Sequence, residues 1–139
     1  MRLKALCALF AAAFALAACN KSETPAEVQH DVAKAEAQGQ REVADARADA
    51  KEAQADADKR VADAVADRDG DDDNLADQAQ DANETADEGQ SKIRIAQAEA
   101  AHRVAVEKCD ALTGDALEEC KDDADETLEQ AREAAKANR

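Results

Sequence analysis

Small apolar side chains recur at helical spacing through residues 28–64 of this 139-residue chain, and this pattern constrains the fold most strongly. The ten intervals between successive members of this stripe cover 36 residues, so the mean spacing is 3.6 residues. This spacing predicts one long α-helix. Val28 and Val32 recur 33 residues later as Val61 and Val65. Because 33 is three times eleven, the local repeat is nearer eleven residues than seven. Such a repeat favours a straight or slightly right-handed bundle. The stripe consists of Val28, Val32, Ala35, Gly39, Val43, Ala46, Ala50, Ala53, Ala57, Val61 and Ala64.

The start of this helix is marked by Thr24, Pro25 and Glu27, which form a capping box with proline in the first helical position. The pattern continues close to Gly70, so we expect a long Ala/Asp-rich helix over 25–68. Two interpretations of its stripe stay open. Either the stripe is the interface of an association, or the helix is single and solvated, because alanine is scattered around its whole circumference.

The chain after residue 18 has few large side chains to bury. Residues 19–139 contain no aromatic residue, and Leu, Ile and Val number thirteen of 121, well below the roughly 20% expected of a globular core. Their net charge is −17, from 16 basic and 33 acidic residues. Such a composition also occurs in disordered chains, but the thirty alanines favour helix. We predict an all-α, partly disordered protein, and we exclude nucleic acid as a partner because an acidic chain repels it.

Residues 69–90 are predicted to form an acidic hinge with weak helix. The stretch 67–88 carries ten carboxylates against one base, Arg68. It is not an EF-hand, because counting from Gly70 puts Val65 and Ala76 at the first and twelfth ligand positions. Loose binding of divalent cations is the alternative to a solvated hinge. Its candidate ligands are Asp67, Asp69, Asp71, Asp72 and Asp73.

Residues 91–139 predict an antiparallel helical hairpin. Gly114 is suited to end a helix, and Asp115 with Glu118 forms a second capping box. Each side of this turn has one apolar helical face. The first face consists of Ile95, Ala98, Ala101, Ala105, Cys109 and Leu112, and the second of Leu117, Cys120, Ala124, Leu128, Ala131 and Ala135.

Cys109 and Cys120 each lie on one of these faces, about five residues from the turn, where a hairpin brings facing positions within disulfide reach. A loop of this length closed by a disulfide gains roughly 3 kcal/mol in the chain-entropy model. A zinc site would need further ligands, and the only histidines are His30 and His102. A catalytic thiol would need a base and an orienting partner. We predict a structural disulfide.

The N-terminal segment has the pattern of a signal peptide. Arg2 and Lys4 precede an uncharged run that ends at Cys19 and is shorter than the roughly twenty residues of a spanning helix. The run ends Leu16-Ala17-Ala18-Cys19, which resembles the lipobox of bacterial lipoproteins. The alternative is an ordinary secretory signal that ends in cysteine.

The resemblance to lipoproteins implies a signal peptide over 1–18, cleavage before Cys19, and diacylglycerol on its sulfur with a fatty acyl chain such as palmitate on its amine. Residues 19–24 are then a lipidated cysteine and a tether. Asn20, in place of an aspartate that marks inner-membrane retention, implies the outer membrane, facing the periplasm.

The stretch 109–120 also resembles a motif of uncharacterised Ala-rich helical envelope proteins of proteobacteria, Cys-Asp-Ala-Leu-x-Gly-x-Ala-x3-Cys. The motif is filled here by Cys109, Asp110, Ala111, Leu112, Gly114, Ala116 and Cys120. This resemblance implies the envelope as compartment and a hairpin as structure. It implies no chemistry.

We expect no enzyme and no cofactor, because residues 19–139 show no nucleophile motif, phosphate loop or metal constellation. Two function classes remain. One is a lipid-anchored spacer or helical interaction partner in the cell envelope, which binds a helical protein or itself. The other is an acidic protein that binds divalent cations or acts in envelope stress. We expect no covalent linkage to peptidoglycan, because the sequence ends Asn138-Arg139 and not in lysine.

Overall fold

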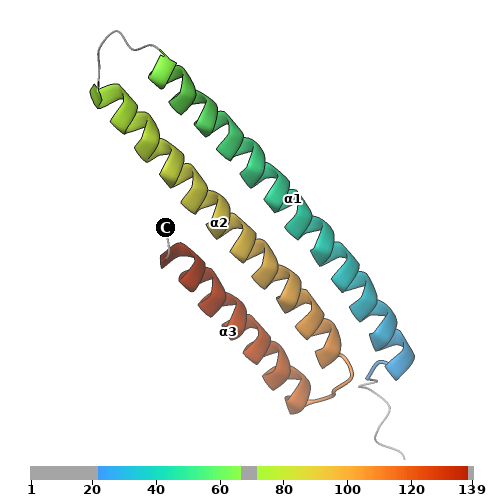
Figure 1. Ribbon diagram of the computed structural model, residues 1–139. Helices are drawn as coiled ribbons and strands as arrows, with labels where there is room; N and C mark the ends of the chain where they lie inside the picture. The colour runs from blue at the N-terminus through green and yellow to red at the C-terminus, as the bar shows by residue number, and fades with distance from the viewer. Residues whose placement is uncertain (1–21, 67–71, 138–139) are drawn as a thin grey trace, which may run out of the picture.

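Three α-helices make up the part of the chain that the computed structural model describes, residues 22–66 and 72–137 (Figure 1). They are α1 (Pro25–Ala66), α2 (Asp72–Cys109) and α3 (Asp115–Ala137). At about 1.5 Å per residue their lengths are about 63, 57 and 35 Å. No strand occurs within the two described ranges, so the all-α prediction is confirmed. Within the same ranges, none of the helices combines the length and the apolar character needed to cross a bilayer.

The helices form one antiparallel layer with α2 in the middle (Figure 1). Across the described residues, α1 and α3 each pack along α2 and do not contact each other. Gly89 and Ala100 of α2 face α1, whereas Ser91 and Cys109 face α3. At 100° per residue, Gly89 and Ser91 point about 200° apart, so the two packing sides of α2 are nearly opposite. Both broad faces of the layer are therefore left without a covering helix.

The predicted stripe of α1 is the surface that packs on α2. Ala35, Gly39 and Ala57 are buried, and the other members are half-buried with one exception. That exception is Ala53, which is exposed, while its neighbour Gln54 is half-buried. The stripe is thus an interface, and the interpretation as a single solvated helix is wrong. The partner that covers it is α2 of the same chain.

Small residues set the distance between α1 and α2. A Cβ atom built on Gly39 would lie 2.5 Å from the Cβ of Ala100, and one built on Gly89 would lie 3.0 Å from the Cβ of Ala50. The two contacts are eleven residues apart on each helix. The eleven-residue repeat read from α1 is therefore matched across the interface by α2, as expected for nearly straight helices.

Residues 72–90 differ from the prediction of an acidic hinge with weak helix over 69–90. They are the first half of α2, which continues without a break to Cys109. The reason is that the charges of residues 74–90 lie on one side of the helix: Asp77 and Glu84 are exposed, while Leu75 and Ala82 are half-buried. An acidic stretch with this periodicity forms an amphipathic helix once α1 covers its apolar side. Residues 67–71 lie outside the described ranges. They comprise the last two residues of the predicted first helix and the first three of the predicted hinge.

The C-terminal hairpin is formed by the second half of α2 and by α3. Every member of the predicted face on α3 is buried or half-buried, and so is the predicted face on α2 except for Ala101 and Leu112, which are exposed. Gly114 has a φ of 63°, the left-handed conformation that favours glycine at the end of a helix. The predicted turn is confirmed.

α3 packs along the second half of α2. Near its C-terminal end, α3 receives a hydrogen bond from the Ser91 hydroxyl to the Ala135 carbonyl oxygen at 3.0 Å. Towards the start of α2, the same side of the helix carries the exposed carboxylates of Asp77, Glu84 and Asp87. On this side, the first half of α2 is not covered by α3 (Figure 1).

Candidate interaction site

The start of α1 is docked beside the turn between α2 and α3. The Glu23 backbone N–H donates to the Asp110 carbonyl oxygen at 3.0 Å. The predicted capping box is present: the Thr24 backbone N–H donates to the Glu27 carboxylate at 2.9 Å, and the Glu27 N–H donates back to the Thr24 hydroxyl at 3.4 Å. Figure 1 shows the first residues of α1 and the α2–α3 turn at the same end of the layer. We call this the tether end.

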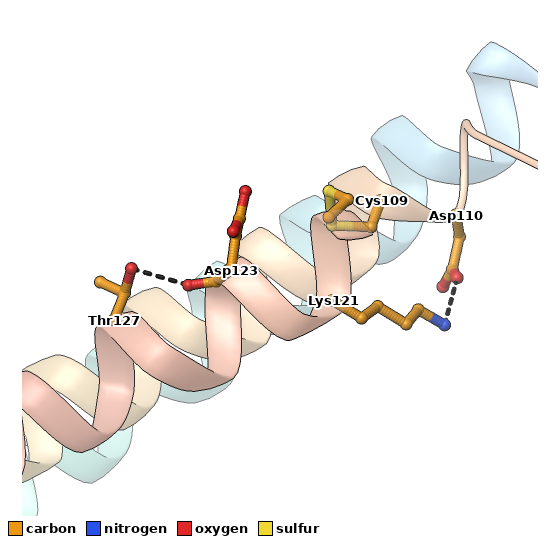
Figure 2. Close-up of a disulfide and its surroundings, with 6 residues drawn as sticks. Cys109, Asp110, Lys121, Asp123 and Thr127 are labelled. Carbon is orange, nitrogen blue, oxygen red and sulfur yellow. Dashed lines mark hydrogen bonds and ion pairs between the residues drawn. A yellow bond between two sulfur atoms is a disulfide. The ribbon is translucent and has the colours of Figure 1, made fainter. Parts of the chain in front are cut away.

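Negative charge is concentrated at the tether end. Partial burial raises the pKa of Glu23 above its ordinary value, and the nearby carboxylates of Asp31, Asp110 and Glu107 raise it further. The one basic partner drawn in Figure 2 is Lys121, whose ammonium lies 2.8 Å from the Asp110 carboxylate. Because of this pair, the pKa of Lys121 is raised.

A disulfide joins Cys109 to Cys120, as predicted, and closes the hairpin next to the turn (Figure 2). The two Cα atoms are 5.7 Å apart, within the usual range for a disulfide. Cys109 is 1% exposed, so its sulfur is part of the packed interior. With both sulfurs in this bond, neither residue serves as a free thiol or as a zinc ligand.

The other predicted sites are only partly within the described residues. Cys19 lies outside them. Three of the five candidate cation ligands, Asp67, Asp69 and Asp71, lie outside them as well. Asp72 and Asp73 are the first two residues of α2. Residues 22–66 and 72–137 contain no group of three or more His, Cys, Asp or Glu side chains that could hold a metal ion.

The two histidines each lie beside a carboxylate. His30 Nδ1 is 3.1 Å from Asp31, and its side chain is largely exposed. His102 Nε2 is 2.6 Å from Asp125, which links α2 to α3. The His102–Asp125 contact thus joins two helices, whereas His30 and Asp31 are neighbours on α1.

One broad face of the layer is closed by ion pairs between helices. Arg103 of α2 pairs with Glu42 of α1. One turn away on α2, Glu99 accepts a hydrogen bond of 2.8 Å from Arg132 of α3. Arg132 also bonds Glu129 of its own helix at 2.8 Å. Each interhelical pair joins oppositely charged side chains that are partly covered, so these pairs link α2 to both of its neighbours on this face.

The opposite face carries the candidate site, an open groove between α1 and α2 that we call the α1–α2 groove. It has two stretches of about 820 and 680 Å³ that share Arg47 and Gln97. The larger, polar stretch has a floor of small residues and Ile93, and its walls carry cationic and amide side chains, with Asp58 as the one carboxylate. These side chains are Arg47, Lys51, Arg94, Gln54, Gln90 and Gln97. The smaller, apolar stretch has a floor of Gly39, Val43, Ala100, Ala101 and Val104, with Lys108 and Glu36 at its edge.

The sequence analysis did not predict this groove, because it left the partner of the first helix open and assigned residues 69–90 to an acidic hinge. The signal that could have found it is the eleven-residue spacing shared by Gly39 and Ala50 on one helix and by Gly89 and Ala100 on the other. Small residues in matching positions bring two helix backbones close together, and the longer side chains beside them then form the walls of a groove.

A second groove of about 560 Å³ lies on this face between α2 and α3. Its floor includes Leu128 and the disulfide, and it shares Ala101, Ala105 and Lys108 with the apolar stretch of the α1–α2 groove. The whole face is thus hollowed along both edges of α2. No family model matches this chain, and neither a curated protein nor a solved structure matches it.

Proposed function

We propose that this protein is a membrane-anchored lipoprotein of the cell envelope, held by lipid on Cys19 in the outer membrane and facing the periplasm. In this proposal the helical layer is a spacer that stands away from the membrane and offers a surface to a helical partner. The proposal rests on the lipobox, on the shape of the layer and on the position of the tether end.

The observation that carries the spacer is the hydrogen bond between Glu23 and Asp110, which fixes the tether end. Cys19 precedes Glu23 by four residues, and four extended residues reach at most about 14 Å. A lipid on Cys19 would therefore hold the tether end close to the bilayer. The far end of α1 is about 63 Å away along the helix.

The charge of the protein supports an upright orientation. The formal net charge of the whole chain is −15, and the tether end itself carries Glu23, Asp31 and Glu107. Anionic headgroups repel such a surface, so a layer lying flat would place many carboxylates against the membrane. An upright layer brings only its narrow end near the headgroups.

The lipid anchor is tested by replacing Cys19 with serine in the full chain. We expect Cys19→Ser to lose the incorporation of labelled palmitate and to leave the membrane fraction or remain unprocessed. Cys7→Ser is the matched control, because Cys7 lies in the predicted signal peptide and should leave both properties unchanged. Wild-type protein that is processed, unlabelled and wholly soluble would contradict the anchor.

The spacer is tested by shortening both long helices in register. Deleting residues 51–61 together with 78–88 removes one eleven-residue repeat from each helix, so the packing faces stay aligned. In neutron reflectometry of the lipidated protein on a supported bilayer, we expect a layer about 60 Å thick, and one about 16 Å thinner for the deletion. Deleting nine residues from each helix instead turns the faces by about half a circle and should unfold the pair. A wild-type layer only one helix thick, roughly 10 Å, would contradict the spacer.

A further inference from the structure

We propose that the outer edge of α1 binds the same edge of a second copy of this chain, with the two α1 helices parallel and in register. This surface lies beside the α1–α2 groove and is distinct from it. The inference deepens the interaction part of the proposed function, because it names the partner and the surface that receives it, and its parallel orientation rests on the lipid anchor. Contact between two copies does not require the lipid, so its test and the test of the anchor can fail separately.

The outer edge of α1 carries a second stripe of small residues, on the side turned away from α2. α1 is an outer helix of the layer, and none of the other described helices covers this edge (Figure 1). At 100° per residue, the members of this stripe point within about 60° of one another and about 150° away from the middle of the stripe that packs on α2. All of them are exposed, and several repeat at intervals of eleven residues, as in the packed stripe. We call them the edge stripe: Ala33, Ala37, Ala44, Ala48, Ala55 and Ala62.

The edge stripe is bordered by two flanks of charged residues, and these flanks have a balance of charge that the whole chain lacks. The chain has 33 acidic and 18 basic residues, whereas the two flanks together have four acidic and five basic. The first flank, which also borders the α1–α2 groove, consists of Glu36, Arg47, Lys51 and Asp58. The second flank consists of Lys34, Arg41, Asp45, Glu52 and Lys59. A second acidic chain can approach such an edge, because at physiological salt a Debye length of about 8 Å screens the carboxylates farther away.

The charges of the two flanks have opposite signs at matching heights along the helix. Each member of the first flank has an opposite charge on the second flank within two positions: Glu36 with Lys34, Arg47 with Asp45, Lys51 with Glu52, and Asp58 with Lys59. Residues one or two positions apart do not face each other on a helix, so none of these pairs can form within α1. In two parallel helices related by a two-fold axis along their length, the first flank of one copy faces the second flank of the other at the same height. All four pairs then form, and the symmetry forms each of them twice.

The eight charged residues of these pairs have no ionic partner in the single chain. All are exposed, and none belongs to an ion pair within residues 22–66 and 72–137. Arg47 and Lys51 are four positions apart, so two like charges are neighbours on the first flank, which destabilises an isolated helix. In the dimer, Asp45 of the second copy lies beside Arg47, and Glu52 of the second copy lies beside Lys51. The dimer thus relieves a repulsion that the single chain retains.

The parallel orientation places both tether ends on one side of the dimer. Lipids on both copies of Cys19 then enter the same membrane surface while the layers stand upright. An antiparallel pair would put the tether ends at opposite ends of the dimer, and only one of them would lie at that surface. The parallel contact runs the length of α1, about 63 Å, and at a width of about 10 Å it buries about 1,300 Å² in total, near the lower limit for a stable interface. We therefore expect a weak dimer that dissociates on dilution and that anchoring in one membrane favours.

Cysteine crosslinking in cells that produce the full chain tests the contact, and it reports contact whether the protein is anchored or soluble. Ala33→Cys, Ala48→Cys and Ala62→Cys each add one cysteine to the edge stripe. We expect each variant to form a disulfide-linked dimer through its added cysteine when copper phenanthroline is supplied as oxidant. The matched control is Asp49→Cys, which is exposed but points about 100° farther from the edge than Ala48. The unchanged chain controls for its own cysteines.

The pattern of crosslinks tests both parts of the proposal. No dimer from the three edge positions, or an equal amount of dimer from Asp49→Cys, would refute the edge as the contact surface. Dimer from only one of the three edge positions would refute the parallel register, because an antiparallel pair brings equivalent residues together at one height only.

Charge reversal separates the effect of paired charges from that of overall charge. In the Ala62→Cys chain, Asp45→Arg should slow crosslinking roughly tenfold, because two attractions to Arg47 become two repulsions. Adding Arg47→Asp exchanges the two signs and should restore the rate. Overall charge alone predicts the opposite for Asp45→Arg, since this change lowers the net negative charge of both chains. The matched control Asp49→Arg makes the same change of charge outside both flanks and should not slow crosslinking. Faster crosslinking with Asp45→Arg, or no rescue by Arg47→Asp, would refute the proposal.

Discussion

Adding one methyl group at Gly39 tests whether α1 packs on α2 in solution. In a solvated helix, Gly→Ala stabilises by about 1 kcal/mol, because alanine has the higher helix propensity. In the packed layer the new Cβ would lie 2.5 Å from the Cβ and 3.2 Å from the Cα of Ala100, so a backbone must move. Overpacking of this kind costs about 1–3 kcal/mol, and we take about 2. We expect Gly39→Ala to lower the free energy of unfolding by about 1 kcal/mol, the difference of the two effects.

The second half of the test restores the space. Ala100→Gly alone should cost about 1 kcal/mol in helix propensity. In the double variant the 2.5 Å contact disappears with the Ala100 methyl group, and only the 3.2 Å contact with the Cα at position 100 remains, so most of the overpacking cost is lost. The gain in helix propensity at Gly39 and the loss at Ala100 then cancel. We expect the double variant to be about as stable as the wild type and more stable than either single variant. The coupling energy of this cycle is then about 2 kcal/mol.

The measurement is urea unfolding followed by far-ultraviolet circular dichroism, on the oxidised chain and at several protein concentrations. Gly89→Ala is a graded comparison, because its Cβ would lie 3.0 Å from that of Ala50 and should carry a smaller penalty. An increase in stability of about 1 kcal/mol for Gly39→Ala, with no coupling to Ala100→Gly, would refute the packing of the two helices. Unfolding midpoints that do not depend on protein concentration would show that the contact is made within one chain.

Three further changes test the ends of the layer by the same unfolding measurement. Replacing Cys109 and Cys120 together by serine should lower the stability of the hairpin by about 3 kcal/mol in the chain-entropy model. Reduction of the wild-type protein should cause a similar loss. A serine variant that is destabilised while the reduced wild type is not would contradict a stabilising disulfide. Thr24→Ala should cost about 1 kcal/mol through the lost cap, and Thr24→Ser should keep most of it. Glu23→Gln should raise stability at pH 7 and have little effect below pH 4. The reason is that a carboxyl group with a raised pKa in the folded state favours folding while protonated, and this contribution is lost as the pH rises above the ordinary value of 4.5. Equal effects of Glu23→Gln at both pH values would rule out this role of its charge.

Periodicity predicted the helices and one of their two interfaces. The spacing from Val28 to Ala64 identified the inward side of α1, and the two apolar faces around Gly114 identified the hairpin and its disulfide. Each of these signals is local: it depends on which residues share a helical face or flank a turn, and such relations are visible in a single sequence.

The pairing of α1 with the start of α2 was not predicted, because the carboxylates of 72–90 outweighed the half-buried side of the same segment. Leu75 is its one large apolar residue, and the contact at Gly89 has no side chain at all. Glycine and alanine give only a weak hydrophobic signal in a sequence, although contacts between them bring two helix backbones close together. The groove follows from the relative position of two helices, so no single stripe could predict it.

The middle position of α2 also determines how the molecule bears a pulling force. A pull at Ser22, with the far end of the layer held, loads α1 along its axis, so the whole stripe from Val28 to Ala64 resists sliding at once. A pull at the C-terminal end of α3 separates α3 from α2 turn by turn, beginning near Ala135. That separation stops at Cys120, where the disulfide holds both helices. The layer is therefore stiff towards its tether and compliant along its third helix.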